Sequence, residues 1–67
     1  MQVARVTEVI ASSEKSFEDA VKAGIARACK RLKKVSGAWV KSQKVVVSEN
    51  RIVEYRVNLK VTFVLED

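Results

Sequence analysis

The sequence contains no histidine, no proline, a single cysteine and only two glycines among its 67 residues. Because histidine is absent and Cys29 is alone, the chain offers neither a metal-binding cluster nor a disulfide framework. It also lacks a glycine-rich phosphate-binding loop, a cysteine beside a candidate base and a carboxylate pair in an apolar setting. We therefore expect a protein that is not an enzyme, with Cys29 as an ordinary packed thiol.

Long apolar runs are absent as well. No stretch approaches the roughly 20 apolar residues of a membrane-spanning helix, and no signal peptide opens the chain, so we expect no membrane partner. A lone thiol without a targeting segment is typical of the cytoplasm, where we place the protein. Residues 1–67 form one small domain near the size at which a single core is marginal, which leaves oligomerisation as the means of stabilising it.

The most regular pattern is the last one in the chain, over residues 51–66. Apolar and polar residues alternate there, which predicts a β-strand with one apolar face and one mostly polar face. No glycine or proline interrupts the run. Such a strand can span about 14 residues, or roughly 45 Å at ~3.3 Å per residue. A chain this short has little with which to cover that face, so we expect a neighbouring copy to cover part of it.

Three elements precede this strand. The pattern predicts a first strand over residues 3–11 and a second over 38–48, which forms an antiparallel hairpin with the last strand through a turn at 49–50. Between them we predict a helix with Ser13 as its N-cap. The helix would end near Ser36 and Gly37, where Gly37 would take the positive φ of a C-cap.

The predicted helix carries an apolar stripe at intervals of three to four residues, which we expect to face the sheet: Phe17, Val21, Ile25, Ala28, Leu32 and Val35. Gly24 lies beside the stripe and indicates a close approach to a strand. The result is an α+β fold of order β-α-β-β, a three-stranded antiparallel sheet wrapped around one helix. A helix of about 21 residues spans only about 30 Å, so part of the last strand stays uncovered and invites a neighbouring copy.

The net charge of +5 raises nucleic acid as a partner. Four cations share the helix face opposite the stripe: Arg27, Lys30, Arg31 and Lys34. The first interpretation is that they favour the negative end of the helix dipole and face water. Acidic side chains of a neighbouring subunit and a polyanion are two further interpretations. Aromatic residues are missing from this face, which does not favour nucleic acid.

Trp39 is the most unusual residue of the second strand. By alternation it lies with Lys41 and Gln43 on the polar face of the sheet, away from the helix. A large aromatic residue there is either an oligomer contact or a platform for a flat ligand. Arg56 lies on the same face of the neighbouring strand and can pair with an anionic or carbonyl-bearing ligand.

The chain resembles the dodecins over nearly its whole length. The resemblance rests on the opening strand, the β-α-β-β order and three short patterns: Ser13-Glu14-x-Ser16-Phe17, Ile25-x-Arg27-Ala28 and Tyr55-x-Val57-x-Leu59-x-Val61-x-Phe63. It implies a hollow homododecamer in which the sheets of adjacent subunits join. It also implies storage of flavins, with a tryptophan stacking on the isoalloxazine ring and a glutamine hydrogen-bonding the ring edge.

At both of these positions the chain departs from the flavin-binding dodecins. An alignment without gaps places Gly37 at the family's tryptophan and Arg56 at its glutamine, while Trp39 stands two residues further on. The resemblance also includes some dodecin relatives that carry arginine there and are not flavin binders, and the partners of these relatives include calcium ions and coenzyme A. We predict a ligand site of four residues, with a flavin of FMN or riboflavin type as the leading ligand: Trp39, Arg56, Gly37 and Gln43. The alternative is a structural shell without flavin that binds coenzyme A or calcium.

Overall fold

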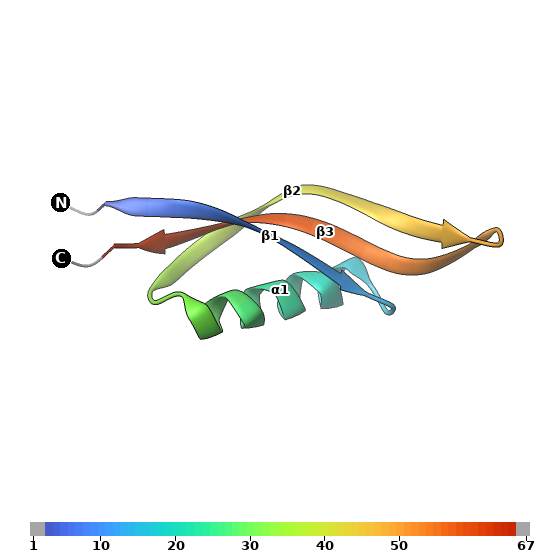
Figure 1. The fold of residues 1–67 in the computed structure, drawn as a ribbon, viewed down its shortest axis with the longest axis horizontal. Coiled ribbons are helices and arrows are strands. Elements are labelled where there is room, and N and C mark those ends of the chain that lie inside the picture. Colours follow the sequence, from blue (N-terminus) through green and yellow to red (C-terminus); the bar gives the residue numbers. More distant parts are fainter. Residues whose placement is uncertain (1–2, 66–67) are drawn as a thin grey trace.

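The computed structural model describes residues 3–65. Its elements are β1 (Ala4–Ser13), α1 (Phe17–Arg31), β2 (Val35–Ser48) and β3 (Arg51–Val64). The three strands form one antiparallel sheet in the order β1-β3-β2, and α1 lies against one face of it (Figure 1). The predicted β-α-β-β fold is confirmed. Within residues 3–65, no helix has the length and apolar character needed to cross a membrane.

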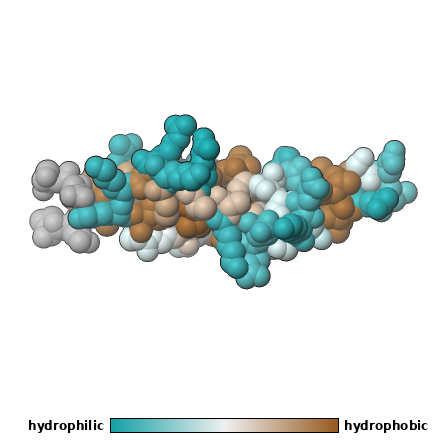
Figure 2. Space-filling view, turned by 90° about the horizontal axis from the view of Figure 1, so that it is seen from below, coloured by the Kyte–Doolittle hydropathy of each residue, from teal (hydrophilic) through white to brown (hydrophobic). Residues whose placement is uncertain are grey.

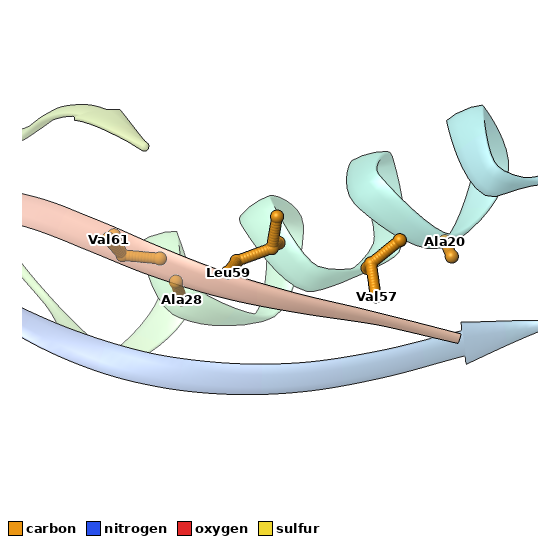
Figure 3. Packing of buried hydrophobic residues seen from close by; sticks show 5 residues of the cluster. All are labelled: Ala20, Ala28, Val57, Leu59 and Val61. Carbon is orange, nitrogen blue, oxygen red and sulfur yellow. The ribbon is translucent and has the colours of Figure 1, made fainter. Parts of the chain in front are cut away.

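The central strand is β3, which has a neighbour on each edge. Its 14 residues agree with the predicted strand as far as Val64, while Glu66 lies outside the described residues. The largest fully buried side chains of residues 3–65 all come from one face of this strand: Val57, Leu59 and Val61. They pack beneath α1 (Figure 3). The alternating pattern therefore predicts the core face correctly.

The residues of α1 that reach the sheet most closely are small. Ala20, Gly24 and Ala28 are buried, while the larger stripe residues pack around them and are half-buried. A Cβ atom built on Gly24 would lie 2.8 Å from Leu59 Cδ1 and 3.1 Å from Ala11 Cβ. The predicted close approach at Gly24 is confirmed, since a side chain there would force Leu59 or the helix to shift.

The helix begins later than predicted. Ser16, not Ser13, is the N-cap, and its Oγ accepts a hydrogen bond from the Asp19 N–H at 3.0 Å. Ser13 is instead the last residue of β1, and its Oγ accepts from the Lys15 N–H at 2.9 Å and donates to Asp19 Oδ2 at 2.7 Å. The prediction was wrong because β1 continues two residues past Ala11.

The helix also ends earlier than predicted, and Gly37 is not its C-cap. The last helical residue is Arg31, and the cap residue Leu32 already has extended backbone angles. The left-handed residue is Lys34, with φ 56°, and β2 begins directly after it at Val35. Gly37 lies inside β2 without a positive φ. The second strand therefore starts three residues earlier than predicted, because Val35 already pairs with Phe63.

The hairpin of β2 and β3 extends beyond the helix (Figure 1). Its turn at Glu49 and Asn50 has φ values of 52° and 62°, as a two-residue type I′ turn requires, and the predicted turn is confirmed. The first helical residue, Phe17, packs edge-on against Tyr55 with ring centroids 5.1 Å apart. The part of the hairpin beyond Tyr55 is uncovered, so the prediction that the helix is too short for the strand is confirmed.

Candidate ligand-binding site

We call the sheet face opposite α1 the outer face. Residues that pair directly across antiparallel strands have their side chains on the same face, so the register assigns each position. On β3 the outer face is formed by the residues between the buried ones: Glu54, Arg56, Asn58, Lys60 and Thr62. This face is polar, and it carries two ion pairs, Glu8 with Lys41 and Glu54 with Arg56.

A pocket of about 400 Å³ lies where the three strands meet around Arg56. We call it the Arg56 pocket, and it is lined by Ile10, Ser42, Gln43, Lys44, Arg56, Val57 and Asn58. Its volume is within the usual range for small-molecule sites, about 300–1,000 Å³. An exposed aliphatic side chain, Ile10, lies beside cations and hydrogen-bonding groups, which is the mixture that holds and orients a small ligand.

Asn58 provides an unused acceptor in this pocket. Its Oδ1 atom is shielded from solvent and has no hydrogen-bond partner among the described residues. The Asn58 side chain also helps to lower the pKa of Glu8, whose main partner is Lys41. A buried acceptor without a partner costs about 1–3 kcal/mol, so a ligand N–H or O–H that reached Asn58 Oδ1 would recover this cost.

Arg56 is held in position by Glu54 two residues before it on the same strand face. Its Nε and Nη2 groups donate to Glu54 Oε1 at 3.1 and 2.8 Å. The hydrogen bond from Arg56 lowers the pKa of Glu54 below its usual range, and Ser12 and the charge of Lys44 act in the same direction. The Nη1 group takes no part in this pair. Arg56 is therefore a pre-positioned donor.

The charges around the pocket favour an anionic or carbonyl-bearing ligand. Lys44 pairs directly with Arg56 across the strands, so two cations stand beside one carboxylate, that of Glu54. Glu8 and Lys41 form the second ion pair at 3.1 Å, and this contact lowers the pKa of Glu8. Both carboxylates are thus ionised at neutral pH and neutralise one cation each.

Trp39 lies on the outer face, as predicted, and its side chain is 60% exposed. It pairs with Lys60, which is four residues from Arg56 along β3, or about 13 Å at ~3.3 Å per residue. The structure places these two predicted site residues on one face but does not bring them into contact within one chain. Gly37 is further away, since it pairs with Thr62, and a Cβ there would meet nothing within 4 Å.

Gln43 does not share the face of Trp39, and this part of the prediction was wrong. The register shifts between Val40 and Ser42, so that Lys41 is an extra residue in β2. Beyond this bulge Gln43 pairs with Val57 and belongs to the helix side of the sheet, although it still lines the Arg56 pocket. A single inserted residue inverts every later position of a strand.

Several residues of this pocket were not predicted from the sequence. Asn58 was placed on the polar face, where an amide is usually hydrated, and its unused acceptor shows only once the packing is known. Strand pairing brings three further residues to the pocket, because Ile10 and Ser42 pair with Asn58 and Lys44 pairs with Arg56. One signal was present in the sequence: Asn58 and Arg56 stand two residues apart and so share a face.

The side chains of the outer face do not form a metal-binding site within one chain. Among residues 3–65, no group of three or more histidine, cysteine, aspartate or glutamate side chains is placed to hold a metal ion. The two carboxylates of the outer face, Glu8 and Glu54, are each paired with a cation.

The fold and the pocket define a small β-α-β-β ligand-binding protein. A sequence model of the Dodecin family matches residues 3–66. Dodecin from Thermus thermophilus is 35% identical over 66 residues, which are 98% of this chain and 96% of that protein. The chain belongs to the dodecin family, whose members bind small ligands.

Solved structures of dodecins agree with this assignment. A single-substitution variant of the Thermus thermophilus dodecin superimposes with a TM-score of 0.94 at 34% identity, covering 100% of both chains. The dodecin from Streptomyces davaonensis gives 0.93 at 26% identity over 98% of this chain and 97% of that one. Calcium dodecin from Mycobacterium tuberculosis, a calcium-chelating antigen with a calcium-binding site, gives 0.84 at 28% identity, covering 96% and 91%.

Proposed function

We propose that this protein is a homododecameric shell that binds and buffers a small ligand between its subunits, and that the leading ligand is a flavin of FMN or riboflavin type. The observation that carries the proposal is the pairing of an unused acceptor, Asn58 Oδ1, with a fixed donor, Arg56, on one strand face. Cytoplasmic storage of such a ligand remains the expected setting.

The hydrogen-bonding edge of an isoalloxazine ring matches this pair. That edge presents one N–H group between two carbonyl groups. Asn58 Oδ1 would accept from the N–H, and Arg56 would donate to a carbonyl. Lys44 lies beside Arg56 and would attract the phosphate of FMN. Gln43 lines the same pocket, although it belongs to the opposite face of the sheet.

The stacking surface comes from a second subunit in this proposal. Trp39 lies about 13 Å along the sheet from Arg56, so a ring held at the Arg56 pocket is not stacked by Trp39 of the same chain. The exposed Trp39 of a neighbouring subunit would cover the ring instead, with Gly37 leaving open space next to it. Binding then depends on assembly, and separated protomers should lose the ligand.

A second candidate ligand is coenzyme A, which the two adjacent cations Lys44 and Arg56 favour because its phosphates carry several negative charges. Calcium is less well supported, since the carboxylates of the outer face are already paired with cations. A calcium site would need ligands from several subunits.

Titration of FMN and riboflavin into the assembled protein, followed by quenching of flavin fluorescence, tests the proposal. Asn58→Leu should weaken the binding of both flavins by about 5- to 150-fold, because a buried ligand N–H without a partner costs about 1–3 kcal/mol. Arg56→Gln should reduce the preference for FMN over riboflavin, since it removes a charge and keeps a donor. Lys22→Gln, at an exposed position of α1, is the control and should leave both affinities unchanged.

Trp39→Ala distinguishes ligand binding from a purely structural role. If Trp39 stacks on a ligand, the shell should survive and flavin affinity should fall. If Trp39 only joins subunits, the particle itself should dissociate. An assembled protein whose flavin affinity is unaffected by both Asn58→Leu and Trp39→Ala would contradict the proposal.

A further inference from the structure

A second pocket lies on the helix side of the sheet, apart from the Arg56 pocket. It is formed between α1 and the edge strand β1, and we call it the α1–β1 pocket. It has a volume of about 180 Å³ and is lined by Thr7, Val9, Arg27, Ala28, Arg31 and Leu32. We propose that this pocket binds a small aromatic carboxylate, with the ring against the aliphatic residues and the carboxylate on the two arginines. The inference adds a site to the proposed function and does not rest on it.

The pocket follows from the way in which α1 packs on the sheet. The helix approaches the sheet most closely at Gly24, where a Cβ atom would meet Leu59. Four residues later, Ala28 is buried but has only a methyl group to place against β1. Thr7 and Val9 point toward the helix, because they pair with buried residues of β3. A short side chain on the helix above an edge strand leaves the pocket between them.

The size and lining of the pocket suit one aromatic ring. Its walls are mainly aliphatic, formed by Val9, Ala28 and Leu32, and Thr7 adds a methyl and a hydroxyl group. In another protein, an apolar cavity of about 150 Å³ binds benzene. The ring of benzoate therefore fits the α1–β1 pocket, whereas the three fused rings of a flavin are too large for it. The two pockets thus select different ligands.

Two guanidinium groups stand at the α1–β1 pocket. Arg27 and Arg31 are four residues apart, so they lie on one face of α1 and repel each other. Both side chains are exposed, and neither forms an ion pair with any of residues 3–65. Figure 2, seen from the helix side, shows hydrophilic side chains beside apolar surface in the half of the molecule where α1 ends. An anion held between the guanidinium groups would remove their repulsion.

The acidic side chains of α1 lie at its other end and already have partners. Glu18 pairs with Lys22, and Asp19 accepts a hydrogen bond from Ser13. Residues 27–34 carry five cations and no acid. A carboxylate with an attached ring suits this setting better than an inorganic anion, because guanidinium groups bind carboxylates in a bidentate manner and the ring fills the apolar part of the pocket.

Saturation-transfer NMR on the assembled protein tests the site, because it detects weak ligands on a large particle. Benzoate is the probe, and it should bind at least about tenfold more tightly than acetate, which has the charge without the ring. Benzyl alcohol, which has the ring without the charge, should bind about fivefold more weakly than benzoate. Naphthoate should also bind more weakly than benzoate, because its second ring exceeds the pocket.

Charge-removing variants locate the site. Arg27→Gln and Arg31→Gln should each weaken benzoate binding about fivefold, the upper end for an exposed ion pair. Lys30→Gln is the matched control, because it removes the same charge from the same helix end but does not line the pocket. It should change the affinity by less than about twofold, through the general field alone. All three residues are exposed, and far-UV circular dichroism establishes that the variants keep their fold.

Equal affinities for benzoate and acetate would overturn the inference, as would equal losses in Arg31→Gln and Lys30→Gln. Either result would mean that this helix face attracts anions in general, as a polyanion-binding surface does. Displacement of benzoate by uncharged riboflavin would also overturn it, because the benzoate would then lie in the Arg56 pocket. Flavin titration of the same samples keeps the two proposals apart. A protein that binds flavin without benzoate rejects only this inference, whereas one that binds benzoate without flavin rejects only the proposed function.

Discussion

The contact between Gly24 and Leu59 allows a quantitative test of the core. A Cβ atom on Gly24 would lie 2.8 Å from Leu59 Cδ1, whereas ordinary contacts begin at 3.4 Å. Overpacking of this kind costs about 1–3 kcal/mol. Replacing glycine by alanine in a helix interior raises the free energy of unfolding by about 1 kcal/mol through helix propensity alone. We therefore expect Gly24→Ala to lower the free energy of unfolding by about 1 kcal/mol, as the difference of these two effects.

Truncating Leu59 should reverse the sign of this effect. Leu59 is fully buried, so Leu59→Ala alone should cost about 2–5 kcal/mol. In that background the short contact is gone, and only Ala11 Cβ at 3.1 Å remains close to the new methyl group. Gly24→Ala should then be neutral or stabilising, which corresponds to a coupling free energy of about 1–2 kcal/mol between the two sites.

The measurement is urea unfolding followed by far-UV circular dichroism for the wild type, both single variants and the double variant. All are compared at one protomer concentration, because assembly makes stability depend on concentration. Ala23→Gly, at an exposed position of α1, measures the helix-propensity term without the contact. A coupling free energy within about 0.5 kcal/mol of zero, as expected for independent sites, would refute the close-packing argument.

Two further predictions concern the helix start and the ion pairs. Ser16→Ala should lower the free energy of unfolding by about 1 kcal/mol, the usual value of an N-cap, and Ser13→Ala by less, as thermal unfolding of the two variants can measure. The folded-state pKa values of Glu8 and Glu54 lie below the ordinary 4.5, chiefly because Lys41 and Arg56 hydrogen-bond these carboxylates. The two ion pairs therefore stabilise the folded protein fully only above pH 4.5, where both carboxylates are ionised. We expect the free energy of unfolding to fall as the pH drops from 4.5 through the folded pKa values, and Glu54→Gln to flatten this dependence; an unchanged slope would contradict the assignment.

Most of the fold could be predicted because β3 alternates without interruption, and the alternation determines which face forms the core. The helix was predicted too long for a physical reason. Leu32 and Val35 continue the helical spacing, yet both pack on the core from outside the helix. Spacing alone does not distinguish a further helical turn from a loop that folds back to the same core. Nor does it reveal that Lys34 takes the left-handed conformation ahead of Gly37.

The candidate site could be predicted only in part. Trp39 and Arg56 were placed on the correct face, because Trp39 precedes the bulge at Lys41 and Arg56 lies where β3 alternates regularly. Gln43 was not, because the bulge at Lys41 inverts the strand and leaves no mark in the alternation. Asn58 was missed because a polar residue on a polar face is usually hydrated, and its shielded oxygen depends on neighbours from other strands.

The most direct test of the account is an absorbance spectrum recorded across a size-exclusion peak of the purified protein, with the mass determined by light scattering. We predict a particle of about 90 kDa, twelve times the 7.5 kDa chain, that carries flavin absorbance bands or binds and quenches added FMN. A 7.5 kDa species, or a large particle that neither carries nor quenches flavin, would contradict the claim that this dodecin buffers flavin between its subunits.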